Sequence, residues 1–108
     1  MLNQTVLVGR LVRDPELYET ESGNKVTNIT LAVPRSYKNS EGVYDTDFII
    51  CVLGKGVAES ATEYCHKGDL LGIKGRIQTR TVELDDESKK NITEVVAEKV
   101  TFLSSKKD

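Results

Sequence analysis

The sequence predicts an all-β protein: a five-stranded barrel with one short helix between the third and fourth strands. Segments rich in β-branched and other apolar residues follow one another, and clusters of Gly, Asn, Asp and Ser separate them at short intervals. Apolar spacing changes to a helical period only once, between residues 56 and 66. The 108 residues have room for one modest core. We expect one domain over residues 1–103, with 104–108 as a short C-terminal end.

The first strand is expected over residues 4–13. Leu7 lies on one side of it and Val6 and Val8 lie on the other, because side chains alternate along a strand. Apolar residues on both sides predict a strand that is buried on both faces. The strand ends before Pro15, which has no amide proton to donate to a strand ladder.

The second and third strands are expected to form a hairpin. A turn at residues 21–24 precedes the second strand, over residues 25–37, and the polar segment 38–42 forms the hairpin loop. The third strand covers residues 45–53. Its apolar run, residues 48–53, again predicts burial on both faces.

The expected helix lies within residues 56–66, where one apolar stripe falls at positions i, i+4 and i+7. Lys67 and Gly68 are suited to end it, since a cation is favoured at the negative helix end and glycine adopts a left-handed cap. The stripe consists of Val57, Ala61 and Tyr64.

The fourth strand, starting at Asp69, has one face with three cations and no acid, in a chain of net charge −2. Such a row is either an ordinary solvated face or a row of phosphate contacts. The opposite face is apolar or small. The polar face holds Lys74, Arg76, Gln78 and Arg80, and the other holds Leu71, Ile73, Gly75 and Ile77.

A charged hairpin tip at residues 85–90 leads to the last strand, residues 92–103. Strict alternation places Val96, Val100 and Phe102 on one side of it and Val95, Ala97 and Leu103 on the other. Three strands, a short helix and a final two-stranded hairpin are the order found in the OB-fold, a partly open five-stranded barrel.

The composition argues against several classes of protein. The pI near 5.5 excludes an all-over basic surface, and no apolar stretch is long enough to cross a bilayer. Cys51 and Cys65 form no ligand-spaced pattern, and with His66 as the one histidine we expect reduced, structural thiols and no metal or other cofactor. Without a signal-like N-terminus, a cytoplasmic protein is expected.

Catalysis is not expected either. Asp45 with Asp47, and Glu94 with Glu98, are the paired carboxylates that strand alternation would place on one face. Neither pair is accompanied by a nucleophile and base, and no glycine-rich phosphate loop is present. Such pairs are more often solvated or engaged in ion pairs, so the sequence predicts neither an enzyme nor a small-molecule substrate.

Several segments together resemble the bacterial and phage single-stranded-DNA-binding (SSB) family, and the resemblance covers the chain from Met1 to about Leu103. The segments are Met1–Asn3, Val6–Leu11, Asp14–Leu17, Thr30–Val33, Asp47–Ile49, Gly75–Arg80 and Thr93–Glu98. The resemblance implies an OB-fold that binds single-stranded DNA with little sequence preference in replication, recombination or repair. It also implies a homo-oligomer, a tetramer or a dimer, in the bacterial cytoplasm, associated with the nucleoid or encoded by a phage.

By position, Tyr37 and Phe48 match aromatic stacking sites of that family, and a cationic groove would hold the DNA backbone. The expected nucleic-acid-binding residues are Arg10, Arg35, Tyr37, Phe48, Lys74, Arg76, Gln78 and Arg80. The exposed face of the first strand, Val6, Val8 and Val12, would be covered by another copy of the chain.

The chain departs from the family pattern in two respects. Leu53-Gly54-Lys55 and Thr81-Val82 stand where aromatic residues often occur, which predicts weaker and more salt-dependent binding; Tyr18 and Tyr44 are possible substitutes. The acidic tail of many members is not part of the sequence, either because this is a short form or because a tail was removed. The alternative function is an OB-fold interaction subunit of a primosome or phage replication complex that binds DNA weakly.

Overall fold

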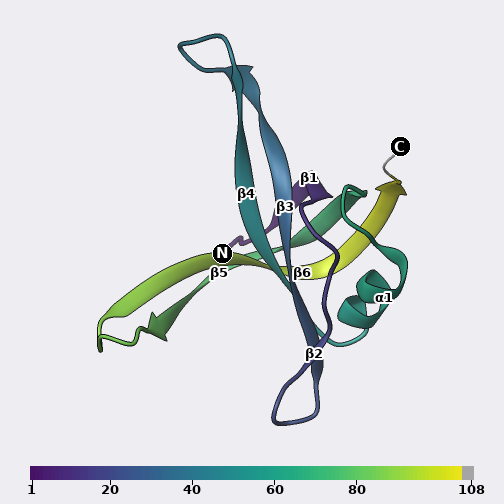
Figure 1. Cartoon of the computed structure of the whole chain (residues 1–108), viewed down its shortest axis with the longest axis vertical. Helices are drawn as coiled ribbons and strands as arrows, with labels where there is room; N and C mark the ends of the chain where they lie inside the picture. Colours follow the sequence, from purple (N-terminus) through teal and green to yellow (C-terminus); the bar gives the residue numbers. More distant parts are fainter. Residues whose placement is uncertain (106–108) are drawn as a thin grey trace.

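The computed structural model describes residues 1–105, which form six strands and one helix (Figure 1). Five long strands and the helix between the third and fourth of them confirm the predicted architecture, and the two-residue strand β2 is an addition that the sequence did not suggest. The elements are β1 (Thr5–Leu11), β2 (Tyr18–Glu19), β3 (Lys25–Lys38), β4 (Tyr44–Leu53), α1 (Val57–Tyr64), β5 (Leu70–Glu83) and β6 (Lys89–Ser104).

The long strands close into a barrel. Their order is β1-β5-β6-β4-β3, and β3 pairs with β1 to complete the circle, with Arg10 opposite Ala32 and Leu11 opposite Leu31. The pairs are antiparallel except for β4 with β6, which run parallel. The hairpins β3–β4 and β5–β6 extend beyond the barrel in different directions (Figure 1). The fold is therefore an OB-type barrel with two long projecting ribbons.

Closure of the barrel depends on Gly9. A Cβ at this position would lie 2.7 Å from the carbonyl oxygen of Ala32, which is closer than real side chains approach. Only glycine lets the β1 backbone come this near to β3.

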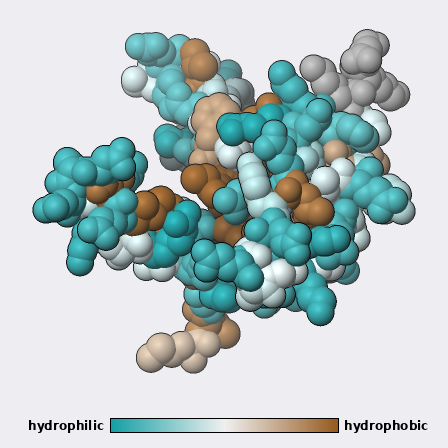
Figure 2. Space-filling view, turned by 60° about the horizontal axis from the view of Figure 1, so that its bottom comes forward, coloured by the Kyte–Doolittle hydropathy of each residue, from teal (hydrophilic) through white to brown (hydrophobic). Residues whose placement is uncertain are grey.

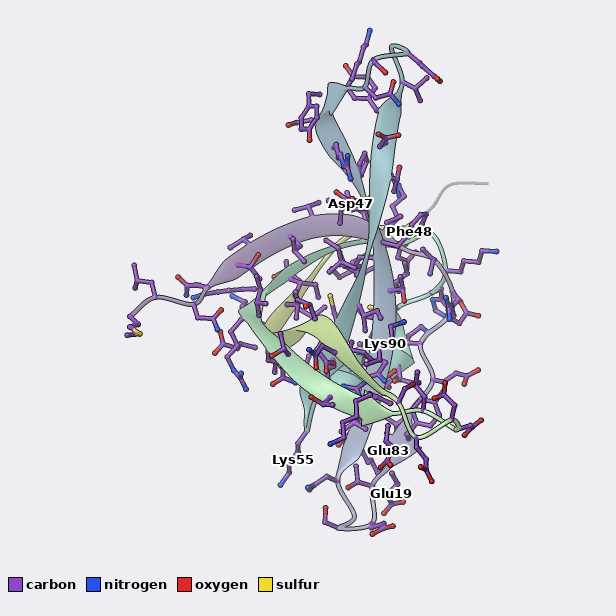
Figure 3. All side chains as sticks on the ribbon, turned by 90° about the vertical axis from the view of Figure 1, so that its left-hand side faces the viewer. Glu19, Asp47, Phe48, Lys55, Glu83 and Lys90 are labelled. Atoms are coloured by element: carbon purple, nitrogen blue, oxygen red, sulfur yellow. The ribbon has the colours of Figure 1, made fainter. Side chains whose placement is uncertain are left out.

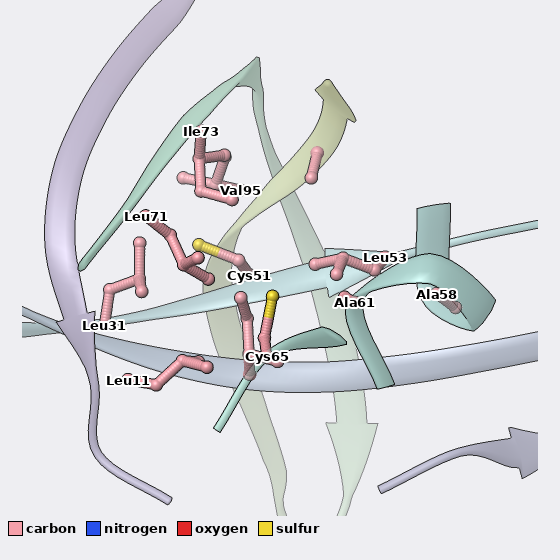
Figure 4. Packing of buried hydrophobic residues seen from close by; sticks show 12 residues of the cluster. Leu11, Leu31, Cys51, Leu53, Ala58, Ala61, Cys65, Leu71, Ile73 and Val95 are labelled. Carbon is pink, nitrogen blue, oxygen red and sulfur yellow. The ribbon is translucent and has the colours of Figure 1, made fainter. Parts of the chain in front are cut away.

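The core lies inside the barrel and under α1 (Figure 4). Every long strand contributes apolar side chains from one of its two faces, and the helix adds small ones. Cys51 and Cys65 are free thiols within this cluster, as the sequence predicts. The fully enclosed members include Leu31, Cys51, Leu53, Ala58, Leu71 and Ile73.

Two strands predicted to be buried on both faces are buried on one. Leu11 and Cys51 point into the core, but Val6 is 72% exposed and Phe48 is 67% exposed. The prediction was wrong because a single barrel encloses one face of each strand and leaves the other outside. The outward apolar side chains of β1 and β4 therefore require another explanation.

The helix is shorter than the predicted segment and buries a different stripe. Ala58 and Ala61 are buried, whereas Tyr64 is 66% exposed. The helix ends at Tyr64, and the next residue, Cys65, is extended. Gly68 does have a positive φ of 90°, but it serves a turn in which the Asp69 N–H donates to the His66 carbonyl, so it is not the helix cap.

Strand β6 contains a bulge that the sequence pattern did not indicate. Lys74 pairs with Lys99 and Gly75 pairs with Ala97, so Glu98 is an extra residue on β6. Beyond Glu98 the alternation between the two faces of β6 shifts by one residue. Val100 and Phe102 therefore lie on the same side as Ala97, and they pair with Ile73 and Leu71, which face inward. The expected grouping of Val96 with Val100 and Phe102 was therefore wrong.

At the C-terminal end, β6 continues through Ser104, one residue beyond the predicted domain limit. Of the predicted C-terminal end, 104–108, residues 106–108 lie outside the described part of the chain. Within residues 1–105 no helix is long and apolar enough to cross a membrane.

Candidate nucleic-acid interface

The outward sides of β4, β6 and β5 form one continuous surface, which we call the outer face. Val52 pairs with Val96, and Val96 pairs with Arg76. Two residues earlier on β6, Glu94 pairs with Gln78. Ile50 and Glu94 directly precede the paired residues Cys51 and Val95, so Ile50 is in register with Glu94. The outer face comprises Phe48, Ile50, Val52, Glu94, Val96, Arg76, Gln78 and Arg80.

A second row connects this face to β1. Phe48 pairs with Ala32 on β3, and Ala32 pairs with Arg10 on β1. Directly paired residues of antiparallel strands project to the same side, so Arg10 and Phe48 share the barrel exterior, separated by a small side chain. The Arg10 guanidinium is held by its Nη1, which donates to the Gly68 carbonyl at 2.9 Å.

The aromatic ring of Phe48 is a large apolar group that is mostly exposed to solvent. Asp47 and Phe48 point to opposite sides of β4 (Figure 3), as neighbouring residues of a strand must. In the space-filling view, hydrophobic atoms are visible between the projecting β5–β6 hairpin and the rest of the molecule, with hydrophilic atoms around them (Figure 2). An exposed apolar zone with a polar rim is typical of a binding surface.

The cations of β5 differ in their surroundings. Arg76 contacts Gln78 on its own strand, with Nη1 3.4 Å from Oε1, and within residues 1–105 neither Lys74 nor Arg76 has an acid partner. Lys74 pairs with Val6 of β1, at the far end of the row. These two cations are therefore available for an anionic ligand.

Arg80 is instead paired with Glu94, which the sequence indicates only as one of two paired carboxylates and not as a residue of the site. Its Nε lies 2.5 Å from Oε1 of Glu94, whose side chain is only 1% exposed. Glu94 is enclosed on the outer face, not in the core. The sequence indicates this contact only through an acid between the apolar positions Ile92 and Val96. The pattern of one strand does not give the pairing register that would identify Arg80 as its partner.

Arg35 lies away from the outer face. Its guanidinium bonds Asp47 at 3.0 Å and lies 3.7 Å from Asp45. Asp47 is on the opposite side of β4 from Phe48 (Figure 3), so the structure brings Arg10 near Phe48 but separates Arg35 from it. The hydrogen bond from Arg35 lowers the pKa of the Asp47 carboxyl, and the same bond raises the pKa of Arg35.

Tyr37 lies in the outer part of the β3–β4 hairpin, with an exposed ring. Pairing of β3 with β4 is irregular between Pro34 and Lys38, so simple alternation does not assign Tyr37 to the outer face. Tyr44 and Tyr18 are also exposed. Tyr44 has the Lys38 ammonium 5.7 Å from its ring centre, and the Tyr18 hydroxyl donates to Glu16.

The paired carboxylates have structural explanations. Asp45 and Asp47 both contact Arg35. Glu94 is enclosed and contacts Arg80, whereas Glu98 is the exposed extra residue of the bulge, where strict alternation is interrupted. The described residues contain no cluster of three or more His, Cys, Asp or Glu side chains placed to hold a metal.

An OB-type barrel with an exposed aromatic ring and a cationic strand on one outer face defines a class of protein, the OB-fold binding protein. Residues 2–103 match the single-strand binding protein family, and the chain belongs to that family. It is a family of binding proteins, in agreement with the expectation that the chain is not an enzyme.

Several bacterial proteins are similar to the chain over nearly its whole length. Single-stranded DNA-binding protein B of Bacillus subtilis is 45% identical, covering 98% of this chain and 94% of that protein. Single-stranded DNA-binding protein 3 of Listeria innocua is 47% identical, covering 100% of this chain and 68% of that protein. A single-stranded DNA-binding protein of Halalkalibacterium halodurans is 50% identical, covering 95% of this chain and 61% of that protein.

Proposed function

We propose that this protein binds single-stranded DNA with little sequence preference, and that the DNA lies across the outer face. The observation that carries the proposal is the continuity of that face, which joins the exposed Phe48 to Arg76 and Arg80 through β6. Similar proteins are named as single-stranded DNA-binding proteins.

The chemistry of the face suits an unpaired strand. Bases stack on aromatic rings whatever their identity, while cations hold the phosphates. Phe48 and Tyr37 are the proposed stacking residues. The proposed backbone contacts are Arg10, Arg35, Lys74, Arg76, Gln78 and Arg80; of these, Arg35 requires the strand to cross the β3–β4 hairpin, because it lies on the other side of that ribbon.

Truncation of both proposed stacking rings tests the function. Stacking contributes about 1–3 kcal/mol per base, so the Tyr37→Ala, Phe48→Ala double variant should bind fluorescently labelled oligo-dT about 30-fold to 10⁴-fold more weakly. Both rings are exposed, at 64% and 67%, so their removal leaves the core intact. Unchanged binding by the double variant would remove these residues from the site.

Tyr64→Ala is the matched control. Tyr64 is 66% exposed, like the two test residues, but it lies on α1 and not on the outer face. Its truncation should leave oligo-dT binding unchanged. Equal losses in the control and in the double variant would show a general effect of removing surface aromatics.

We also infer that the chain assembles with copies of itself, first as a dimer and then as a tetramer. Val6 and Val8 are exposed on β1, and residues 5–9 pair only with β5 within the described chain. An apolar face beside an open strand edge favours a symmetric partner. Light scattering should give a multiple of the 12.0 kDa chain mass, and Val8→Glu should lower it.

A role in replication, recombination or repair in the bacterial cytoplasm, on the nucleoid or on phage DNA, accords with this proposal. The second candidate is an interaction subunit that binds DNA weakly. It is favoured by the pairing of Arg35 and Arg80 with acids, which leaves fewer unpaired cations on the surface. Micromolar or weaker affinity of the wild-type protein for long oligo-dT at low salt would favour this second function.

A further inference from the structure

Glu94 is a buried acid on a surface that otherwise suits phosphates. Its Oε1 accepts from Nε of Arg80, while its Oε2 is enclosed and has no hydrogen-bond partner within the described residues. Enclosing a carboxylate is costly unless its partner and surroundings compensate. An apolar residue would fill the same site between Ile50 and Gln78 without that cost. The presence of an acid at this position therefore calls for a functional explanation.

The contact with Arg80 uses one edge of the guanidinium. Arg80 donates through Nε, and among hydrogen bonds within residues 1–105 its two terminal nitrogens have no acceptor. The Arg80 side chain is 48% exposed although its partner is enclosed. The fork of terminal N–H groups, which suits two oxygens of a phosphate, is therefore free while the rest of the group is fixed.

We propose that Glu94 is a positioning residue for Arg80: it anchors the guanidinium at Nε, presents the terminal nitrogens to a DNA phosphate and offsets part of the cationic charge. The inference rests on the proposed function and adds to it a residue that does not itself touch DNA. Anchoring strengthens the phosphate contact because less side-chain freedom is lost on binding. The enclosed negative charge weakens the same contact, because it repels the phosphate.

Two substitutions separate these effects. Glu94→Gln removes the charge but keeps an oxygen that accepts from Nε, whereas Glu94→Leu removes both the charge and the anchor. We expect E94Q to bind labelled oligo-dT roughly three- to tenfold more tightly than wild type at low salt. E94L should lose most of this gain and bind roughly three- to tenfold more weakly than E94Q.

Salt dependence distinguishes positioning from a general structural effect. A structural role alone would change the midpoint of thermal unfolding without changing the slope of log K against log salt. We expect the slope to become steeper in E94Q, by up to about 0.7, the value of one phosphate contact on a single strand. When each is combined with R80Q, E94Q and E94L should bind alike, because the residue that Glu94 positions is gone.

The inference is overturned if E94Q binds no more tightly than wild type, or if the difference between E94Q and E94L persists in the R80Q background. Where E94L does not fold, the cycle of wild type, E94Q, R80Q and the R80Q, E94Q double variant still decides whether Glu94 acts through Arg80. A wild-type protein that does not bind oligo-dT contradicts the proposed function instead. Wild-type binding with unchanged E94Q affinity contradicts this inference alone.

Discussion

The guanidinium of Arg35 is bonded to both carboxylate oxygens of Asp47, at 3.0 to 3.3 Å. With Arg80 held by Glu94, two of the five cations proposed for the site already have acid partners. The other three, Arg10, Lys74 and Arg76, have no acid partner within residues 1–105. The pattern of pairing, more than the total charge, determines where an anionic ligand is attracted.

The pH dependence of the Arg35–Asp47 pair follows from the hydrogen bond, which lowers the Asp47 pKa below its unfolded value. The pair therefore stabilises the folded state above the unfolded pKa, near 4, and this stabilisation is lost as the pH falls through the folded value. NMR titration of the Asp47 carboxyl carbon should show a pKa that rises towards the ordinary value in Arg35→Gln. The same pKa in both proteins would show that the pair does not form in solution.

Unpaired cations should dominate the salt dependence of DNA binding. Lys74→Gln and Arg76→Gln should each reduce the slope of log K against log salt by about 0.7, the value for one phosphate on a single strand. Lys25→Gln is the control, because Lys25 lies opposite Glu19 near the β2–β3 turn, away from β5. A slope that falls equally in all three variants would mean that the effect is one of net charge.

Gly75 should be intolerant of a side chain. A Cβ there would lie 2.1 Å from the carbonyl oxygen of Val96, where backbone and not a flexible side chain is in the way. Gly75→Ala should lower the free energy of unfolding in urea by about 1–3 kcal/mol, as overpacking does. Gly54→Ala is the matched control, because nothing lies within 4 Å of its Cβ. Equal stability of the two variants would contradict the close approach of β5 and β6.

The Cys51 thiol should be unreactive in the folded protein. Burial raises its pKa to about 11, and the side chain is fully enclosed. In Cys65→Ser, which retains Cys51 alone, a thiol reagent at pH 8 should react slowly in buffer and rapidly in urea. Because the folded pKa is raised, the contribution of Cys51 to stability is complete below the unfolded value and declines as the pH rises towards 11. Immediate labelling in buffer would contradict burial.

Much of the fold could be predicted from local patterns. The five long strands, the helix and the two polar hairpin tips all follow from residue period and turn chemistry, which act over a few residues. Burial was predicted less well. Val8 and Phe48 look like core residues in the sequence, and only the closure of one barrel decides which face of β1 or β4 is enclosed.

The candidate site was predicted in part for a related reason. The row from Lys74 to Arg80 follows from alternation along one strand, so the structure retains it. The enclosure of Glu94, its contact with Arg80 and the separation of Arg35 from Phe48 depend on the register within the β5–β6 and β3–β4 hairpins. Such register is set by three-dimensional pairing, which a single strand pattern does not contain.

The bulge at Glu98 makes the length of β6 matter more than the identity of the residue that forms it. Deletion of Glu98 would move every later residue by one position and turn Val100 and Phe102 outwards, while the hairpin half that carries Glu94 would keep its register. Many side chains can occupy position 98, but an insertion or deletion between Ala97 and Lys99 would exchange inside for outside. Homologous chains that share this barrel should therefore vary in residue type at this point while conserving the residue count.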